Sequence, residues 1–302
     1  MKIIGIVVTR NRYDSLITSL ASVFKEGERW LSGVIVVDNG STDQTASLTD
    51  KVDKIKVIHL PYNLGLERGI ATGIQCAMRL DVDGILLFDD DSIFLPNSIS
   101  ALVESFLLYK KEAAISALPL SDLNGELSSP RLIGSKILTT KQELLAANNG
   151  KGHICTMKLH FNGCLIGREW LEKIPFTGML GEEAYGALLY RAGCLLIIDA
   201  NANILHPSIK RYETRILNLP FGRSTIVWHL PPWKAYQAAR ESVVKRAILS
   251  STFRFFTFDL PGVVGIYLLR ILFEKQRMFK LPFYFKGLLD GVKIAISLKQ
   301  LG

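Results

Sequence analysis

The sequence has few cysteines, and they form no recognisable pairs. Its four cysteines (Cys76, Cys155, Cys164 and Cys194) are widely separated, and none forms the C-x-x-C pair that a zinc or redox site would need. We therefore expect reduced thiols, as in a cytosolic protein. The first residues, MKIIGIVVTRNR, lack the apolar region of roughly 7 to 15 residues and the cleavage site of a signal peptide. This start predicts a buried first strand.

Long apolar runs are missing too. The longest one late in the chain, 260–273, is interrupted by Arg270. It falls short of the roughly 20 residues that a membrane-spanning helix requires. We therefore expect that the protein does not cross a bilayer.

Acidic residues are scarce only in the last third of the chain. Residues 1–200 contain 20 Lys and Arg against 23 Asp and Glu, whereas residues 201–302 contain 16 against 5, so the formal net charge of +8 arises in the second part. Basic and aromatic residues interleave there: Lys245, Arg246, Arg254, Arg270, Lys275, Arg277 and Lys280 with Phe253, Phe255, Phe256, Tyr267 and Phe279. This composition favours an anionic membrane surface or a phosphorylated acceptor, with an ordinary helical domain and a solvated basic face as the alternative. No nucleic-acid recognition motif occurs, so we expect no nucleic-acid partner.

The apolar residues, 48% of the chain, follow the pattern of an α/β fold. Short apolar runs at 3–9, 34–38, 57–60 and 85–88 predict strands. Between them, apolar residues recur at three- and four-residue intervals, which predicts helices. Near-continuous apolar strands separated by amphipathic helices favour a mostly parallel sheet with helices on both faces.

The later segments continue this pattern and then change. They predict a helix opened by Pro96, a strand at 115–118, a helix near Trp170, a helix at 182–191 and a strand at 195–198. Residues 122–158 have weak periodicity, and we interpret them as a variable insertion. From Pro231 onward the pattern is that of amphipathic helices. We expect one domain at 1–215 and a basic, aromatic helical extension at 216–302, either independent of the first or packed closely on it.

Polar residues follow each predicted strand of the first hundred residues. The strands lead into Thr9-Arg10-Asn11-Arg12, Asp38-Asn39-Gly40, Asn63-Leu64-Gly65 and Asp89-Asp90-Asp91. In open parallel sheets, ligands bind beyond the carboxyl ends of the strands. The four polar strand ends therefore predict a ligand site at one edge of the sheet.

The three consecutive aspartates are the strongest chemical signal. Carboxylates at the end of a buried strand are costly unless a cation neutralises them, and their oxygens suit Mg²⁺ or Mn²⁺. Asp89 and Asp91 lie on the same side of an extended chain, so one can reach a metal ion directly while the other reaches the same ion or a sugar hydroxyl. Such an ion would bridge a diphosphate and stabilise a departing phosphate. An acidic surface turn or a helix N-cap is the alternative.

The other strand ends offer groups that suit a nucleotide. Asp38 can accept hydrogen bonds from a nucleobase or ribose, whereas Ser41 to Asp43 favour helix capping. A hydroxyl, an amide and a guanidinium follow the first strand, and Arg68 can reach a diphosphate. We predict nucleotide contacts from Thr9, Asn11, Arg12, Asp38, Asn39, Asn63, Arg68, Asp89 and Asp90.

Two further candidates lie downstream. Glu182 and Glu183 open a helix after Gly181, where a carboxylate is favourable even without a catalytic role. One of them is the best candidate for a general base acting on an attacking hydroxyl. His206 follows an apolar strand; a lone histidine is more often structural, but imidazole can also complete an Asp-rich Mn²⁺ site.

Together, VVTRNR, VVDNGSTD, NLG and LLFDDDS in this order resemble the family 2 glycosyltransferases of the GT-A fold, a Rossmann-like mixed sheet. The match covers residues 1–110 strongly and 160–210 more loosely. The resemblance implies that Asp89 and Asp91 are metal or donor ligands for Mn²⁺ or Mg²⁺, that Asp38 contacts the nucleotide and that His206 is a third metal ligand. It also implies a base in the acidic motif. Here that motif is Glu182-Glu183-Ala184-Tyr185-Gly186 instead of an acidic residue followed by Asp, so Glu182 fits by spacing and Glu183 stays open.

The three-aspartate motif looks most like that of bacterial galactofuranosyl- and rhamnosyltransferases. The basic, aromatic C-terminus is similar to members that act on lipid-linked glycans at the cytoplasmic face of the membrane. The resemblance implies an inverting transfer from a UDP-sugar, with galactofuranose expected, to a glycan or polyprenyl-diphosphate-linked acceptor in cell-surface polysaccharide synthesis such as that of O antigen. It implies a cytoplasmic protein, peripheral on the inner face of the membrane. The alternatives are transfer from dTDP-rhamnose, a noncatalytic binding module, and a nucleotidyltransferase, which residues 9–14 disfavour because they contain no glycine.

Overall fold

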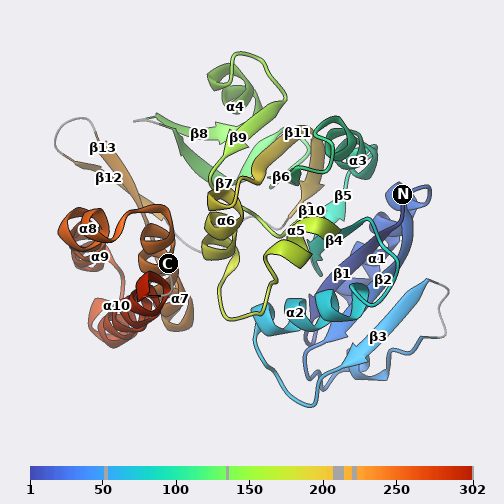
Figure 1. Cartoon of the computed structure of the whole chain (residues 1–302), viewed down its shortest axis with the longest axis horizontal. Coiled ribbons are helices and arrows are strands. Elements are labelled where there is room, and N and C mark those ends of the chain that lie inside the picture. Colours follow the sequence, from blue (N-terminus) through green and yellow to red (C-terminus); the bar gives the residue numbers. More distant parts are fainter. Residues whose placement is uncertain (51–53, 134–135, 207–213, 220–222, 301–302) are drawn as a thin grey trace.

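The computed structural model describes residues 1–50, 54–133, 136–206, 214–219 and 223–300 (Figure 1). The first part of the chain alternates strands and helices as expected. Its elements are β1 (Ile3–Thr9), α1 (Tyr13–Gly27), β2 (Leu31–Asp38), the 3-10 helix η1 (Gln44–Ser47), β3 (Ile55–His59), α2 (Leu66–Ala77) and β4 (Gly84–Asp89).

The second part adds strands to the same sheet. Its elements are β5 (Ile93–Phe94), α3 (Ser98–Leu108), β6 (Ala113–Leu120), β10 (Cys164–Gly167), α5 (Arg168–Lys173), α6 (Glu182–Arg191) and β11 (Leu195–Leu205). The helix expected to open at Pro96 begins after Asn97 instead, because Asn97 has a left-handed backbone with φ of 64° that a helix cannot continue.

The sheet is mixed and mostly parallel, as the sequence predicts. Its strands lie in the order β3, β2, β1, β4, β10, β6, β11, β5. The pairs of β1 with β2, β1 with β4, β2 with β3 and β6 with β11 are parallel, whereas β10 runs antiparallel between β4 and β6. The carboxyl ends of β1, β2 and β4 therefore share one edge.

Helices cover both faces of the sheet because successive strand residues point to opposite sides. Ile3 and Val7 of β1 pack in one core with α1 and α3. Ile4 and Ile6 pack in the other core with α2, α5 and α6. This double layer fixes the strand ends on which the polar residues sit.

The expected insertion at 122–158 is folded and adds to the sheet. It contains β7 (Glu126–Ile133), β8 (Lys136–Thr140), α4 (Lys141–Ala147) and β9 (His153–Thr156). β9 pairs with β11, and α4 starts with a capping box of Thr140 and Glu143. The periodicity is weak because β8, α4 and β9 contain only five, seven and four residues.

The C-terminal part contains a hairpin and helices. The hairpin is β12 (Thr214–Leu219) and β13 (Arg223–Trp228), and the expected boundary between residues 215 and 216 falls inside β12. The helices are α7 (Pro232–Leu249), α8 (Thr252–Arg254), the π-helical turn η3 (Phe255–Asp259), α9 (Leu260–Phe273) and α10 (Arg277–Gln300). Figure 1 shows α8, α9 and α10 at the end of the molecule away from β3.

One expectation about this part is wrong. The apolar stretch 260–273 was expected to be too short for a membrane, but α8, η3 and α9 form one helix from Thr252 to Phe273 with 22 residues. Within the described ranges it is the one helix that is long and apolar enough to cross a bilayer. The residues that precede Leu260 are also helical and supply the missing length.

The helical extension packs closely on the first domain through α7. The Gly181 amide at the start of α6 donates to Glu241 Oε2 at 3.0 Å, and Lys245 Nζ lies 3.0 Å from Glu183 Oε2. Ala184 and Ala187 of α6 are buried against Val244 and Ile248 of α7. The helix α6, which carries both candidate bases, therefore packs on the sheet through Tyr185 and Leu189 and on α7 through Ala184 and Ala187.

Candidate active site

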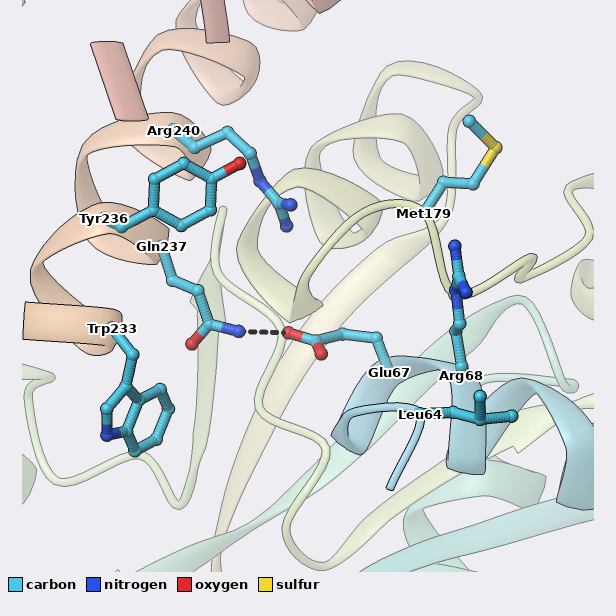
Figure 2. Close-up of a pocket in the computed structure, with 9 residues that line it drawn as sticks. Leu64, Glu67, Arg68, Met179, Trp233, Tyr236, Gln237 and Arg240 are labelled. Carbon is cyan, nitrogen blue, oxygen red and sulfur yellow. Dashed lines mark hydrogen bonds between the residues drawn. The ribbon is translucent and has the colours of Figure 1, made fainter. Parts of the chain in front are cut away.

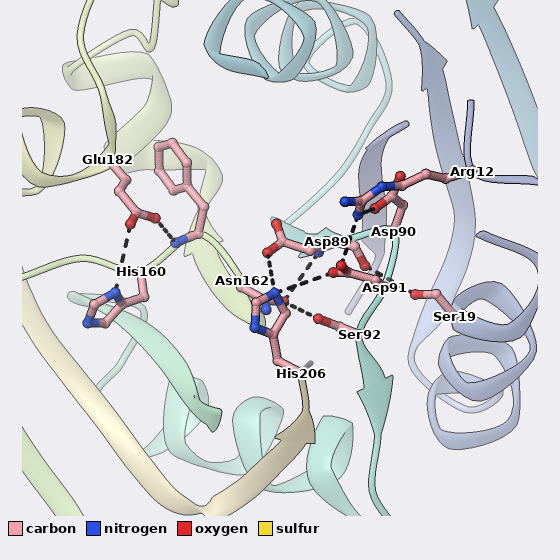
Figure 3. A network of polar contacts seen from close by, with 11 residues as sticks. Arg12, Ser19, Asp89, Asp90, Asp91, Ser92, His160, Asn162, Glu182 and His206 are labelled. Atoms are coloured by element: carbon pink, nitrogen blue, oxygen red, sulfur yellow. Dashed lines mark hydrogen bonds and ion pairs between the residues drawn. The ribbon is translucent and has the colours of Figure 1, made fainter. Parts of the chain in front are cut away.

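Three of the residues expected to bind metal meet at the carboxyl edge of the sheet (Figure 3). Asp89 ends β4, and His206 directly follows β11. His206 Nε2 lies 3.3 Å from a carboxylate oxygen of Asp89 and 3.3 Å from one of Asp91. Ligand atoms of the three side chains all lie within 4.8 Å of one another, so the group can hold a metal ion. Asp89 and Asp91 converge through a turn at 90–91, not along an extended chain.

The turn that carries the aspartates is fixed by neighbouring side chains. Asn162 Oδ1 accepts hydrogen bonds from the Asp89 amide at 3.2 Å and from Ser92 Oγ at 2.9 Å. Ser19 Oγ donates to the Asp89 carbonyl at 3.2 Å. The role of Asn162 was not predictable from sequence, because an Asn before Gly163 indicates a turn and nothing more.

Asp90 points into the protein and is only 5% exposed. Thr9 Oγ1 donates to it at 2.8 Å, and Arg12 Nη1 lies 3.0 Å from Asp90 and 2.8 Å from Asp91. Burial raises the pKa of the Asp90 carboxyl, although Thr9 and Arg12 act in the opposite direction. Thr9 and Arg12 thus support the acidic cluster, and their contacts with a nucleotide stay predictions.

The charges of the cluster are balanced by His206 and Arg12. Burial acts to lower the pKa of His206, but hydrogen bonds and charges of Asp89 and Asp91 outweigh it and raise the pKa to about 9. Burial acts to raise the pKa of Asp91, but His206 and Arg12 outweigh it and lower that pKa. A divalent ion must therefore displace a proton from His206. One imidazole with two carboxylates is a donor set that suits Mn²⁺.

The strand end at Asp38 is bonded within the protein. Asp38 is 2% exposed; it accepts from the Ser41 amide at 2.9 Å and lies 2.8 Å from Nδ1 of His59. The role of His59 was not predictable from sequence, because its contact with Asp38 joins the end of β3 to the end of β2. Asp43 caps η1 through the Thr45 amide at 3.0 Å, which confirms the capping interpretation for Asp43; Ser41 Oγ instead accepts from the Asn11 amide at 2.9 Å.

Asn39 and Asn11 link neighbouring loops. The buried Asn39 accepts from the Leu64 amide at 2.8 Å and donates to the Gly65 carbonyl at 3.1 Å. Asn11 Oδ1 accepts from the Thr42 amide at 2.7 Å. These amides order the loops at the sheet edge, and their predicted nucleotide contacts are not tested by the structure.

Asn63 and Arg68 are exposed at the end of β3 and the start of α2. Asn63 accepts from the Gly65 amide at 3.0 Å. Arg68 lines a cavity of about 380 Å³ between α2, the loop at 178–179 and α7 (Figure 2). The other walls are formed by Leu64, Glu67, Gly178, Met179, Trp233, Tyr236, Gln237 and Arg240. Gln237 Nε2 donates to Glu67 Oε1 at 3.0 Å across the cavity.

The two candidate bases have different surroundings. Glu183 lies 3.0 Å from Lys245 and 3.6 Å from Lys158; burial acts to raise its pKa, but both lysines outweigh it and lower the pKa. Glu182 accepts from the Phe161 amide at 2.9 Å, and its other oxygen lies 3.9 Å from His160 Nδ1. Glu182 and Asp89 therefore bond to adjacent residues of one loop, Phe161 and Asn162 (Figure 3).

Comparison with solved structures shows the same fold. A mannosyltransferase from Pyrobaculum calidifontis, PcManGT, in complex with GDP-Man and Mn²⁺, has 13% sequence identity and a TM-score of 0.55, over 99% of this chain and 86% of that one. GalNAc-T7, crystallised with UDP, GalNAc and Mn²⁺, has 14% identity and a TM-score of 0.54, over 68% of this chain and 44% of that one. Both are glycosyltransferases, and the arrangement is the GT-A fold that the sequence predicts.

Sequence comparison is consistent with this. An uncharacterized protein of Methanocaldococcus jannaschii is 29% identical over 116 residues, which is 38% of this chain and 46% of that protein, so the chain spans about half the length of that curated relative. The family model described as glycosyl transferase family 2 matches residues 6–164, more than half of the chain, and ends beside Asn162 and Gly163. The chain therefore belongs to glycosyl transferase family 2.

Proposed function

We propose that this glycosyltransferase transfers a sugar from a nucleotide-sugar donor to an acceptor hydroxyl with inversion, using the acidic cluster of Asp89, Asp91 and His206 as its metal site. The convergence of those three side chains at the carboxyl edge of the sheet is the observation that carries the proposal. Mn²⁺ or Mg²⁺ would offset the charge that develops on the leaving nucleotide diphosphate. The Mn²⁺ in the PcManGT and GalNAc-T7 structures supports this choice.

Glu182 is the base in this proposal. Inversion in one displacement needs a carboxylate that takes the proton of the acceptor hydroxyl on the side opposite the leaving group. Glu183 is the poorer candidate, because two lysines lower its pKa and so weaken it as a base. Glu182 has no lysine partner among its described contacts and shares a loop with Asp89.

The cavity between α2 and α7 suits the acceptor. Glu241 of α7 accepts from the Gly181 amide next to Glu182, so the cavity wall at Arg240 continues towards the base. Trp233, 56% exposed, offers an aromatic face on which a sugar ring can stack, while Gln237 and Glu67 offer hydrogen-bonding groups. Arg240 suits a phosphate on the acceptor, whereas Arg68, on the α2 side of the cavity, stays the predicted contact of the donor diphosphate. A glycan linked to polyprenyl diphosphate combines these features.

For the donor we propose a UDP-sugar with galactofuranose, in cell-surface polysaccharide synthesis at the cytoplasmic face of the membrane. The similarity of the three-aspartate motif to galactofuranosyltransferases supports it. The same similarity extends to rhamnosyltransferases, so dTDP-rhamnose is the second candidate donor. UDP in GalNAc-T7 and GDP-Man in PcManGT show that this fold accepts more than one nucleotide.

The test measures donor binding and transfer separately. Thermal shifts with Mn²⁺ and each of the UDP-, GDP- and dTDP-sugars should show one preferred nucleotide, and stabilisation should require the metal. Asp89→Asn and Asp91→Asn should each abolish Mn²⁺-dependent stabilisation and turnover. Asp81→Asn is the matched control: its side chain is 93% exposed and it precedes β4, at the strand end opposite to Asp89, so both properties should stay unchanged. Full activity in both cluster variants would refute the metal site; donor binding without turnover under any condition would favour a noncatalytic module.

A further inference from the structure

The long apolar helix of residues 252–273 is largely uncovered. Only 22% of its most apolar window is buried inside the protein. Phe255, Val263, Tyr267 and Ile271 are buried, the last three at four-residue spacing, and pack with α7 and α10. The rest of the helix exposes large side chains, of which Phe253 is 75% and Phe258 is 65% exposed. One stripe therefore holds the helix to the protein, and the remainder faces outward.

α10 adds further exposed apolar residues beside this helix. Met278 is 76%, Phe279 65% and Leu289 62% exposed. We call the whole set the C-terminal apolar surface; it consists of Phe253, Phe256, Phe258, Leu268, Leu272, Met278, Phe279, Phe283, Phe285 and Leu289. Single exposed apolar residues are ordinary, but a concentration of this kind on adjacent helices indicates a binding surface.

The charge of this region specifies an anionic partner. Residues 252–300 contain eight Lys and Arg against three Asp and Glu, a net charge of +5. Arg254 and Lys293 have side chains 70% and 78% exposed, although each also lies near an acidic side chain, Arg254 at 3.6 Å from Asp259 and Lys293 at 3.4 Å from Asp290. Glu274 and Lys280 form a buried ion pair at 2.7 Å, so these two charges offset each other and neither faces a partner. A second copy of the chain would bring two positive surfaces together, which disfavours a dimer here.

We propose that the C-terminal apolar surface inserts into the headgroup region of an anionic lipid bilayer, with the helix of residues 252–273 lying in the membrane plane. Exposed aromatic and aliphatic side chains would enter the outer acyl region while basic side chains contact lipid phosphates. Aromatic rings favour this boundary because it is apolar on one side and wet on the other.

The lateral contacts of the helix explain why it lies in the plane and does not cross. Tyr267 hydroxyl donates to the Ala238 carbonyl of α7 at 2.7 Å and lies 2.8 Å from Ser242 Oγ. α7 in turn is tied to α6 through Glu241 and Lys245. A crossing helix would have to leave these partners or draw the charged residues of α7 into the acyl layer, both of which are unfavourable.

Flotation of the full chain with lipid vesicles tests the proposal. The experiment contains no metal and no sugar nucleotide, so its result does not depend on whether the proposed metal site is correct. We expect binding to vesicles of phosphatidylcholine with phosphatidylglycerol, weaker binding to phosphatidylcholine alone, and loss of binding as salt is raised. Alkaline carbonate should release the bound protein. No binding to the anionic vesicles at low salt overturns the proposal, and retention after carbonate overturns the in-plane arrangement.

Two sets of variants locate the surface. Phe253→Ser, Phe258→Ser and Leu272→Ser combined should weaken vesicle binding at least about tenfold. The matched control, Leu108→Ser with Leu123→Ser, changes residues 66% and 76% exposed on the first domain and should bind as the parent does. Equal loss in both sets contradicts the assignment.

The charge variants remain informative if the apolar variant does not fold. Arg254→Gln with Arg277→Gln should weaken binding to anionic vesicles about fivefold per charge removed and flatten its salt dependence. Arg79→Gln with Lys110→Gln, two exposed residues of the first domain, is the control. A parent-like affinity in the first pair, or an equal loss in the second, overturns the proposal, and so does a discrete dimer that does not bind vesicles.

Discussion

At the acidic edge of the sheet, charged side chains are buried, whereas in the C-terminal helices large aromatic side chains are exposed. Asp90 is 5% exposed, and Phe253 is 75% exposed. Both distributions are unfavourable for an isolated soluble chain. At the acidic edge, Arg12 and His206 offset part of the negative charge of the aspartates. Among the described residues, nothing covers the C-terminal apolar surface. The difference indicates a small cation as partner in the first region and an extended surface in the second.

The two glutamates of α6 lie between these regions, because α6 contacts α7 of the C-terminal part. Substituting them should have the largest effect on the rate of sugar transfer. Glu182→Gln should reduce transfer about 10²- to 10⁴-fold, because the acceptor hydroxyl loses its base, while Mn²⁺-dependent donor binding stays unchanged. Glu183→Gln should keep most of the activity, since Glu183 pairs with Lys245 and Lys158. Initial rates and thermal shifts on both variants check this. If Glu183→Gln lowers the transfer rate more than Glu182→Gln does, Glu183 is the base and Glu182 is not.

The choice between these glutamates shows where prediction from sequence ends. Strand ends such as Asp38 and Asp89 could be predicted because a local pattern, an apolar run that stops at a carboxylate, places them at one edge. The partners that separate Glu182 from Glu183 are distant in sequence: Lys245 lies 62 residues from Glu183, and Phe161 lies 21 residues from Glu182. No periodicity reports such contacts.

The same limit applies to the C-terminal region. Its charge and aromatic content are composition, which the sequence states directly, and its helices follow from apolar spacing. The continuity of α8, η3 and α9 was not predicted, because only the apolar run at 260–273 was counted. Pro261 is tolerated in the first turn of α9, and the π turn connects that turn to α8. Asn162 and His59 were missed because their roles depend on which loops the sheet brings together.

A substitution that disturbs the close packing of α10 on α7 should have the next largest effect, which is on stability. A Cβ added at Gly287 would lie 2.3 Å from the Tyr236 carbonyl, so Gly287→Ala should destabilise the protein by about 1–3 kcal/mol. It should also lower activity, because α7 supports α6 through Glu241. Gly265→Ala on α9 is the control: nothing lies within 4 Å of the added Cβ, and stability should be unchanged or slightly higher.

Denaturant unfolding and transfer rates on both glycine variants decide how far the two regions are coupled. If Gly287→Ala loses stability in the C-terminal helices but transfers sugar at the parent rate, α7 does not support the active site. If Gly265→Ala loses as much stability as Gly287→Ala, the steric reason is wrong.

Arg12 tests the compensation at the acidic edge and should have a smaller effect. Arg12→Gln leaves Asp90 buried without its cation, and because the Arg12 side chain is 39% exposed we expect a loss of about 1 kcal/mol of stability without metal. Affinity for Mn²⁺ alone should rise, since a positive charge beside Asp91 is removed. Calorimetric titration with Mn²⁺ and unfolding in chelator measure both. Weaker Mn²⁺ binding would mean that Arg12 orders the ligands more than it competes with the ion.

The smallest expected effect is the pH dependence that His59 contributes at the end of β2. A hydrogen bond from His59 to Asp38 raises the pKa of the imidazole above its ordinary 6.5, and the Leu48 carbonyl adds to this. The stability that protonated His59 supplies is therefore full below pH 6.5 and is lost as pH rises through the raised pKa. It should be well under about 1 kcal/mol, because the side chain is 42% exposed and solvent screens the pair. His59→Gln should remove this component, so the difference between the unfolding midpoints of parent and variant should shrink as pH rises from 6.5. A constant difference across that range would mean that His59 acts through packing on Asp38 and not through its charge.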